Sequence, residues 1–289
     1  MIEFNKIVIK ELFSNIFEHG AWTIFVDEKY KTCDDGESIL VNNKISLCTT
    51  VMNRSDDLIR SLPQNIEDNK DYPNLEFLIL DYNSSSNELI KLINFLSQPL
   101  YLELINEGRL IFYRTEEPSH YSMSHSRNIA FKQAKGDIVV NVDADNLTNK
   151  GFASKINQLA NAKPEMAIFA KGKRMLRGRL GFYKKEFIEL LGGYNEDFIG
   201  YGVDDRDIMC RAFGLGFTAM CFGGKYFGIV EQIIKENKTI NMINQNWKYT
   251  EKLNKIISFF NLAYGLYKAN INRKWGVVND LKSFWELEL

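Results

Sequence analysis

The sequence lacks any apolar run long enough to cross a membrane. A membrane-spanning helix needs roughly 18 or more consecutive apolar residues, and no stretch of the 289-residue chain approaches that length. The first residues, Met1–Lys6, include the acidic Glu3 and lack the apolar core of a secretion signal. These absences predict a cytoplasmic protein and leave open a peripheral contact with the inner surface of a membrane.

Cysteine is also scarce, and the four cysteines (Cys33, Cys48, Cys210 and Cys221) show no CxxC pairing. Cys48 and Cys221 lie in apolar runs that are typical of core strands. We therefore predict buried free thiols in a reducing compartment.

No excess of one charge marks the chain, because 36 Lys and Arg residues balance 37 Asp and Glu residues to a formal net charge of −1. The sequence therefore lacks the basic field that nucleic-acid binding uses. Basic residues do gather locally, in a run formed by Lys171, Lys173, Arg174, Arg177 and Arg179. This run fits either a solvated loop or a loop that faces phosphate or an acidic acceptor.

From Ile45 onward, short apolar runs alternate with segments of helical period. Strands that alternate with helices over short connections predict parallel βαβ units. We therefore expect an α/β fold with a Rossmann-like, mostly parallel sheet flanked by helices. The predicted strands are 45–51, 75–80, 110–113, 137–142, 166–170, 180–183 and 217–222. The predicted helices begin at Ser55, Phe152 and Asp204 or cover 89–95, 122–135 (closed by Gly136) and 186–191.

The remaining segments divide the chain into parts. Residues 1–44 form an N-terminal extension packed on the core, with a short amphipathic helix over Ile7–Phe17. The core covers 45–235, in two halves, 45–150 and 151–235. Residues 236–289 form a C-terminal helical segment.

Polar side chains follow the predicted strands at their carboxyl ends. Thr50 and Arg54 follow the first strand, Asp81 ends the second, and Asp143 and Asp145 end the fourth. In open α/β sheets, ligands bind beyond the carboxyl ends of the strands. The sequence therefore predicts a ligand site at this edge of the sheet.

The Asp143-Ala144-Asp145 segment follows the apolar run Ile138–Val140. Carboxylates suit hard cations such as Mg²⁺ and Mn²⁺, which bridge diphosphate oxygens. One aspartate would then bind the metal while the other meets a ribose or sugar hydroxyl. A solvated turn is the alternative interpretation of the same three residues.

A second acidic pair, Asp204-Asp205, opens a predicted helix after the glycine-rich segment 200–203. A carboxylate there could take a proton from an attacking hydroxyl, or simply cap the helix. Tyr201, between Gly200 and Gly202, could stack on a sugar face or anchor the loop.

Taken together, these segments resemble nucleotide-sugar glycosyltransferases of family 2, which have the GT-A fold. The last part of the core is similar to a galactosyltransferase-type acceptor module, and the resemblance covers roughly residues 45–235. It implies a nucleotide-sugar half over 45–150 and an acceptor half over 151–235. The segments that carry it are Cys48–Arg54, Leu80-Asp81, Ser126-Arg127-Asn128, Asp143 with Asp145, Gly192–Glu196 and Gly200–Asp205.

The resemblance implies roles for the donor half by position. Thr50 and Asp81 would contact the nucleotide base and ribose, and Arg54 would lie near the diphosphate. Asp143 would contact the ribose or donor sugar and stand beside the metal. Asp145 would ligate that metal, Mn²⁺ or Mg²⁺.

The same resemblance implies roles around the acceptor. Asp204, with Tyr201, would orient the acceptor, and Asp205 would be the general base. Arg127 and Asn128 would either shape the donor pocket or serve a structural role.

Two features depart from the family pattern. Many relatives supply a histidine metal ligand after the acceptor helix, whereas this chain has only His19, His120 and His125. Glu231 or Gln232 could replace it, or Asp145, diphosphate and water could hold the metal. The acidic run at Asp204 is also interrupted by Arg206, so acceptor preference does not carry over. For His125, a packing role is preferred to contact with the donor.

The sequence therefore predicts an inverting, metal-assisted transfer of a hexose from a UDP-sugar to a hydroxyl. The acceptor would be a surface polysaccharide, a glycolipid or a glycoprotein. One rival is a nucleotidyltransferase that makes NDP-sugars, but segment 49–54 lacks the glycine-rich phosphate loop of that class. The other rival is a degenerate transferase that acts as a sugar-binding or scaffold subunit.

Overall fold

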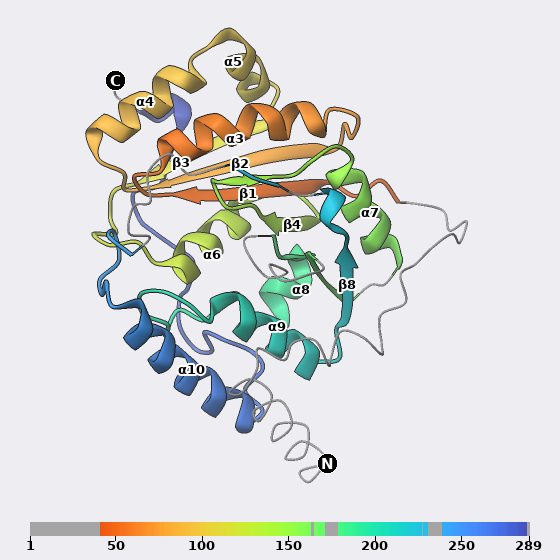
Figure 1. The fold of residues 1–289 in the computed structure, drawn as a ribbon, viewed down its shortest axis with the longest axis vertical. Coiled ribbons are helices and arrows are strands. Elements are labelled where there is room, and N and C mark those ends of the chain that lie inside the picture. The colour runs from red at the N-terminus through yellow and green to blue at the C-terminus, as the bar shows by residue number, and fades with distance from the viewer. Residues whose placement is uncertain (1–40, 163–164, 171–178, 227, 231–238, 288–289) are drawn as a thin grey trace.

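A central sheet of eight strands organises the protein (Figure 1). The computed structural model describes residues 41–162, 165–170, 179–226, 228–230 and 239–287. The strand order is β10-β3-β2-β1-β4-β7-β6-β8, with parallel pairing of β1 to β2, β2 to β3, β1 to β4 and β6 to β8. The strands are β1 Ile45–Val51, β2 Leu75–Tyr82, β3 Leu110–Thr115, β4 Ile138–Asn141, β6 Met166–Ala170, β7 Gly181–Tyr183, β8 Thr218–Phe222 and β10 Lys282–Ser283.

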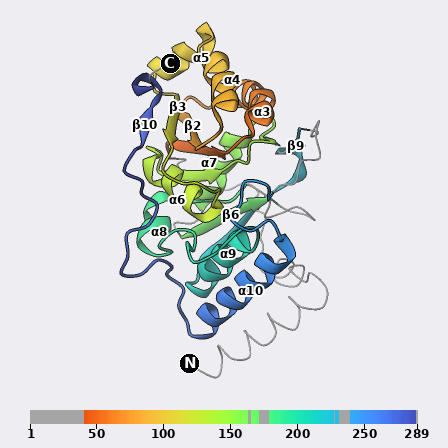
Figure 2. The ribbon, with the colours of Figure 1, turned by 90° about the vertical axis from the view of Figure 1, so that its left-hand side faces the viewer.

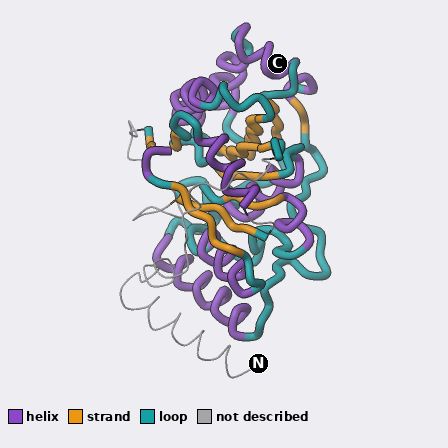
Figure 3. Tube along the Cα trace, turned by 90° about the vertical axis from the view of Figure 1, so that its right-hand side faces the viewer, coloured by secondary structure: helices purple, strands orange, loops and turns teal. Residues whose placement is uncertain are grey.

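Helices cover both faces of this sheet, with the strands between them (Figure 3). One face carries α3 Ser55–Asp68, α4 Ser86–Leu96, α5 Pro99–Asn106 and α7 Phe152–Ala162. The other carries α6 Met123–Gln133, α8 Lys184–Glu189 and α9 Asp204–Gly214, and α10 Trp247–Ala263 lies against α9, outside this layer (Figure 2). Two 3₁₀ turns cover Gly224–Tyr226 and Phe284–Glu286. The described part of the chain contains no helix with the length and apolarity to span a membrane.

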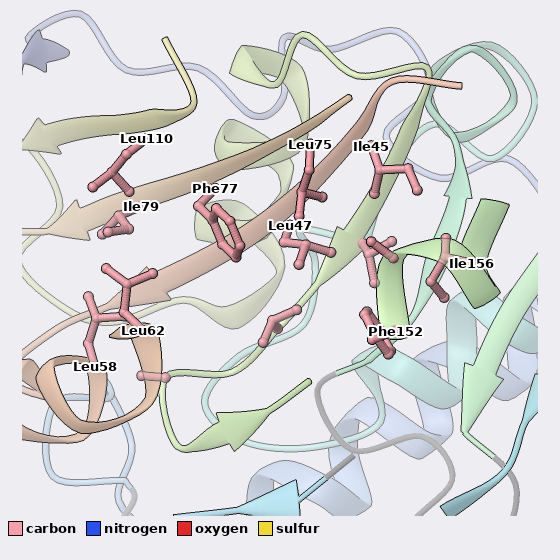
Figure 4. Close-up of a cluster of buried hydrophobic side chains, with 14 of the residues drawn as sticks. Ile45, Leu47, Leu58, Leu62, Leu75, Phe77, Ile79, Leu110, Phe152 and Ile156 are labelled. Carbon is pink, nitrogen blue, oxygen red and sulfur yellow. The ribbon is translucent and has the colours of Figure 1, made fainter. Parts of the chain in front are cut away.

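The two hydrophobic cores follow from the two-residue period of the strands. In β2, Phe77 and Ile79 point into the core under α3, whereas Leu78 and Leu80 point into the core over α6. Figure 4 shows the first core, where Leu58 and other side chains of α3 meet the sheet. Each central strand is therefore apolar on both faces, as expected for a sheet with helices on both sides.

The α/β prediction is confirmed, and the seven predicted strands are all present. Helix α5 was not predicted from the sequence. Cys48 is buried in β1, Cys221 is partly buried in β8, and Cys33 lies outside the described residues. The division of the chain into an extension, a core and a C-terminal segment stays a prediction.

The prediction of a helical C-terminal segment is correct only for α10 within residues 239–287. Beyond Ala263 the chain runs back along the body to β10, which pairs antiparallel with β3 and is followed by the 3₁₀ turn Phe284–Glu286 (Figure 2). On the way, Ala269 N donates to Leu191 O at 2.9 Å, and Thr115 Oγ1 donates to Asp280. The C-terminal segment is thus tied to the core along its length.

The role predicted for Gly136 was wrong. The sequence predicted that Gly136 closes a helix over 122–135, but α6 ends at Gln133 with Ala134 as its C-cap, and Gly136 is not among the residues with a positive φ. Instead, the Gly136 backbone lies against β1, where its N–H donates to Ser46 Oγ at 2.8 Å. A Cβ at position 136 would lie 2.4 Å from Ser46 Oγ and 2.7 Å from Ser46 N.

We therefore expect Gly136→Ala to lower the free energy of unfolding by about 1–3 kcal/mol, because a backbone atom of β1 cannot move aside easily. Urea denaturation measures this change. Gly223→Ala is the matched control, since a Cβ there meets nothing within 4 Å, and its effect should stay within about 0.5 kcal/mol. Equal effects of the two substitutions would contradict the close-approach explanation.

Candidate active site

The predicted polar residues meet around the first turns of α6 and α9, beside the ends of β1 and β4. Ser122 caps the start of helix α6, and its hydroxyl accepts the His125 N–H at 3.3 Å. The first turns of α6 are almost entirely buried. Side chains of these turns contact different parts of the site: Ser126 bonds Thr50 at the end of β1, and Asn128 bonds the backbone of Tyr194. Arg127 contacts the aspartates.

Arg127 joins the two acidic centres that the sequence predicted separately. Its Nη1 donates to Asp204 and to Asp205 Oδ1, the latter at 2.9 Å, and its Nη2 donates to Asp143 Oδ1 at 3.1 Å. The guanidinium also lies 5.4 Å from the ring centre of Tyr194. The Arg127 side chain is only 2% exposed. One buried cation thus holds three carboxylates, one from the donor half and two from the acceptor half.

The electrostatics of this cluster follow from burial and charge number. Burial disfavours the charged guanidinium, but Asp205, Asp204 and Asp143 outweigh it and raise the pKa of Arg127 well above its usual value. Desolvation by the surrounding protein also opposes ionisation of Asp143, yet Arg127 and Asn141 hold the pKa of that carboxyl below its usual value. Burial raises the pKa of Asp204, and Arg127 offsets this only in part.

A strained loop delivers the second acidic pair. Val203, at the N-cap of α9, has φ +82, which is an outlier for a β-branched residue. Gly200 and Gly202 also have positive φ. Asn254 of α10 fixes the loop, since its Nδ2 donates to Ile199 O at 3.0 Å and Gly202 O at 2.9 Å. Strained backbone of this kind persists only where the surroundings enforce it.

Asp145 lies near Arg54, whereas Asp143 pairs with Arg127. Arg54 Nη2 is 4.0 Å from Asp145 Oδ2, and Arg54 also pairs with Asp57 on α3. The short strand β5 Asn146–Leu147 pairs with β9 Gly228–Ile229, and Val230 N donates to Asp145 O at 2.9 Å. The chain just before Glu231 is therefore fixed beside Asp145. Glu231 and Gln232, the proposed substitute ligands, lie outside the described residues.

The carboxylates of Asp143 and Asp145 fit a hard divalent cation in their chemistry. Among the described residues, no cluster of three or more His, Cys, Asp or Glu side chains could hold a metal alone. A cation held by one or two carboxylates and by substrate phosphates needs no such cluster. Asp145 is the better ligand of the two, because Asp143 Oδ1 already accepts from Arg127 and Asn141.

Thr50 and Asp81 are placed differently from each other. Thr50, at the end of β1, is partly exposed, and its hydroxyl bonds Tyr121 Oη at 2.7 Å and accepts from Ser126 Oγ at 3.3 Å. Asp81 lies inside β2, is fully buried, pairs with Arg114 and accepts the Ser84 N–H at 3.1 Å. Burial raises the pKa of Asp81 although Arg114 and Ser84 oppose it.

Two roles were predicted for Asn128, shaping the donor pocket or a structural role, and its contacts favour the structural one. Its Nδ2 donates to Tyr194 O and Glu196 Oε1, and its Oδ1 accepts the Tyr194 N–H at 2.8 Å. His125 bonds Tyr82 Oη at 2.6 Å and Val277 O at 3.1 Å, which agrees with a packing role. Tyr201 is partly exposed, and its backbone is bonded to Thr250 Oγ1.

The basic run offers only one residue for description. Arg179 is buried, and its Nη2 donates to Gly228 O at 2.5 Å. Arg179 is therefore not in a solvated position, and its positive charge helps to lower the pKa of Asp143 in the candidate site. The other four residues of the run, at positions 171, 173, 174 and 177, lie outside the described residues.

Comparison with known proteins decides the family. A family model described as "Glycosyl transferase family 2" matches residues 46–213. This match covers more than half of the chain and includes both acidic centres. The chain belongs to glycosyltransferase family 2.

Solved structures with a similar fold are glycosyltransferases at low identity. The mannosyltransferase PcManGT from Pyrobaculum calidifontis, in complex with GDP-Man and Mn²⁺, is 17% identical with a TM-score of 0.57, over 92% of this chain and 81% of that one. S. aureus TarS 1-349 with UDP-GlcNAc is 15% identical with a TM-score of 0.57, over 79% and 68%. GalNAc-T7 with UDP, GalNAc and Mn²⁺ is 13% identical with a TM-score of 0.53, over 66% and 44%. No curated protein sequence matches.

These comparisons confirm the resemblance to family 2 and to the GT-A fold. The galactosyltransferase-type character of the acceptor half stays a prediction. Arg114, Tyr121 and Tyr194 of this family 2 glycosyltransferase had no role assigned from the sequence, although Tyr194 lies in the segment Gly192–Glu196 that carries the resemblance. Only Arg114 carried a signal, because it directly follows the predicted buried strand 110–113 and a cation there needs an anion beside it; its β2 register partner is Asp81.

Arg127→Met should lower the free energy of unfolding by about 3–5 kcal/mol at pH 8, because it leaves buried carboxylates without their partner. Burial then keeps the folded-state pKa of Asp204 above its unfolded value. A carboxyl whose pKa is higher in the folded than in the unfolded protein stabilises the folded state at low pH. This contribution to the free energy of unfolding is lost as pH rises through the folded-state pKa. The defect should therefore be smaller at pH 5 than at pH 8.

Urea denaturation at the two pH values measures both effects. Adding Asp204→Asn to Arg127→Met should recover part of the stability at pH 8 and flatten the pH dependence. Arg109→Met is the control, since this half-exposed arginine pairs with Glu107 at the surface and should change stability by about 0.5 kcal/mol or less. A defect in Arg127→Met that grows toward low pH would contradict the assignment.

Proposed function

We propose that this glycosyltransferase moves a hexose, with inversion, from a UDP-sugar to a hydroxyl of a glycan or glycoconjugate. The observation that carries the proposal is the position of Arg127 between Asp143 and the Asp204-Asp205 pair. Two acidic centres with different tasks must lie a fixed distance apart in a single-displacement transfer. A shared buried guanidinium fixes that distance.

In the proposed donor site, Thr50 and Asp81 contact the nucleoside and Arg54 lies near the diphosphate. Thr50 and Arg54 are both partly exposed at the end of β1, where ligands of parallel sheets bind. Asp81 is fully buried on Arg114, and its proposed part in nucleoside binding is to anchor the turn that follows β2. The nucleotide-sugar complexes of the structural relatives support this class of donor.

In the proposed reaction, the acceptor hydroxyl oxygen bonds to the anomeric carbon as the bond from that carbon to the diphosphate oxygen breaks. Asp205 takes the hydroxyl proton, and UDP leaves with the electron pair of the broken bond. Asp205 suits this task better than Asp204 because its side chain is 18% exposed against 6%. Asp204, buried on Arg127 at the start of α9, is proposed to orient the acceptor together with the partly exposed Tyr201.

Asp145, with support from Asp143, is the residue proposed to hold Mn²⁺ or Mg²⁺ together with diphosphate oxygens. When bound, such a cation supplies charge stabilisation for the leaving diphosphate. The two Mn²⁺ complexes among the structural relatives support this assignment. Arg54, 4.0 Å from Asp145, adds a fixed positive charge at the same place.

Membership of family 2 favours this proposal over the NDP-sugar nucleotidyltransferase. The two differ in product, because the transferase releases UDP from a UDP-sugar and the rival releases pyrophosphate from a nucleoside triphosphate. The degenerate scaffold predicts neither product.

We expect Asp205→Asn to lower kcat for UDP release by about 10²–10⁴-fold, the usual contribution of general base catalysis. The KM for the UDP-sugar should change little, since Asp205 does not contact the donor. A panel of UDP-hexoses with Mn²⁺ and glycan acceptors provides the assay. Asp207→Asn is unsuitable as a control because Asp207 is buried on Arg211.

Asp197→Asn is the matched control, because Asp197 is exposed and pairs only with the surface residue Arg273. This variant should keep wild-type turnover. Near-normal turnover by Asp205→Asn with the UDP-sugar still bound would remove Asp205 from the role of base.

A further inference from the structure

Helix α10 has its polar side turned inward. Its fully or nearly buried residues are Thr250, Asn254 and Ser258, which share one face at a spacing of four. Each makes a specific contact with the acceptor half. Thr250 Oγ1 donates to Tyr201 O at 3.1 Å, and Ser258 Oγ donates to Asp207 Oδ1 at 2.7 Å. Hydrogen bonds, rather than apolar packing, therefore anchor this face of α10.

A stripe of exposed apolar residues, which includes the C-cap Tyr264, lies on the outer side of α10. Tyr249, Ile256, Phe260 and Tyr264 are 55%, 45%, 52% and 77% exposed, and Leu253 between them is half-buried. Their spacing of three, four and seven residues places them on one stripe of the helix. Ile240 and Ile243, in the chain that leads to α10, are 56% and 67% exposed. Contiguous exposed apolar groups of this kind mark an interaction surface.

A basic stripe runs beside the apolar one. Lys248, Lys252 and Lys255 repeat at the same helical spacing, and Lys248 and Lys252 are exposed. Over residues 239–274 the chain has one acidic residue, Glu251, and six basic residues, Lys248, Lys252, Lys255, Lys268, Arg273 and Lys274. This local excess contrasts with the net charge of −1 for the whole chain. On α10 itself Lys255 pairs with Glu251, so the exposed Lys248 and Lys252 give the outer side of the helix its positive charge beside the apolar stripe.

We propose that this outer side docks on a lipid bilayer surface with anionic headgroups. Helices that lie in a membrane interface combine an apolar stripe that includes aromatic side chains with flanking lysines. Tyr and Trp side chains suit the headgroup level, where one end of the ring is apolar and the other is wet, and Trp247 at the start of α10 is 46% exposed. The positive charge complements anionic lipid and selects it over a neutral surface.

The docking surface lies directly behind the loop that opens α9. The same helix holds Ile199 and Gly202 through Asn254 and holds Tyr201 through Thr250. A bilayer on the outer side of α10 would therefore lie one helix diameter from the proposed acceptor loop. If the proposed function holds, the acceptor is a glycan attached to that surface. This last step rests on the proposed function, whereas the docking itself does not.

Flotation of the full-length protein with lipid vesicles tests the docking, without any nucleotide sugar present. Vesicles of neutral phosphatidylcholine are compared with vesicles that contain phosphatidylglycerol as the anionic lipid. We expect binding to the anionic vesicles only, and weaker binding as salt rises. Absence of binding by the wild-type protein would overturn the proposal.

Two variant pairs separate the apolar from the cationic contribution. Lys248→Glu with Lys252→Glu should weaken binding at least about 25-fold, since each lysine near an anionic bilayer contributes about fivefold. Phe260→Ser with Tyr264→Ser should weaken it at least about tenfold at any salt concentration. Lys70→Glu with Ile90→Ser is the control and should bind as the wild type does, since Lys70 is exposed in the turn after α3 and Ile90 is exposed on α4. Unchanged binding by both α10 variants would overturn the proposal.

Residues 1–40 are the rival occupant of this surface, because the sequence predicts an amphipathic helix over Ile7–Phe17. A photo-activated cross-linker at position 260 of the full-length chain distinguishes the two. Transfer of the label to lipid in the presence of anionic vesicles supports the proposal. Cross-links only into residues 1–40, or only to a second copy of the chain, would overturn it. UDP release, measured with a soluble acceptor, reports on the proposed function independently of either outcome.

Discussion

The ion pair between Arg127 and three aspartates is the interaction on which the rest of the site depends. Four carboxylates gathered at one edge of a sheet would repel one another and resist burial. A guanidinium that is fully enclosed and always charged removes this difficulty for three of them, and its fork geometry also fixes where they point. The two acidic centres, 59 residues or more apart in the sequence, are thereby held at one place.

Helix α6 extends the same principle to its neighbours. Ser126 bonds Thr50 at the end of β1, Asn128 bonds the backbone of Tyr194, and His125 bonds Tyr82. Parallel strands bring their carboxyl ends to one edge, but that alone does not set side-chain positions. The buried turns of α6 set them, while α10 enforces the strained backbone before Asp204. Rigid helices on both sides of the loop therefore support the proposed chemistry, as functional geometry generally requires.

The sequence predicts the sheet well because its strands are short apolar runs, separated by segments whose apolar residues recur with the period of a helix. The sequence also predicts Asp143, Asp145, Asp204 and Asp205 as site residues, because these acidic residues stand directly beside segments that are predicted to be buried. It does not predict that Arg127 joins them, because contacts between distant segments leave no local pattern. Helix α5 was missed since its apolar residues continue those of α4 across a short turn. The inward polar face of α10 was missed because Thr, Asn and Ser normally indicate a solvated face.

The most direct test of the central claim is a double-mutant cycle on the free energy of unfolding, with Asp143→Asn and Asp205→Asn. Both side chains bond Arg127 but come from different halves of the core. A shared cation predicts a coupling energy of about 0.5 kcal/mol or more between them. The same cycle with Asp143→Asn and the distant Asp280→Asn should be additive. Additivity of Asp143→Asn and Asp205→Asn within about 0.3 kcal/mol would contradict the account.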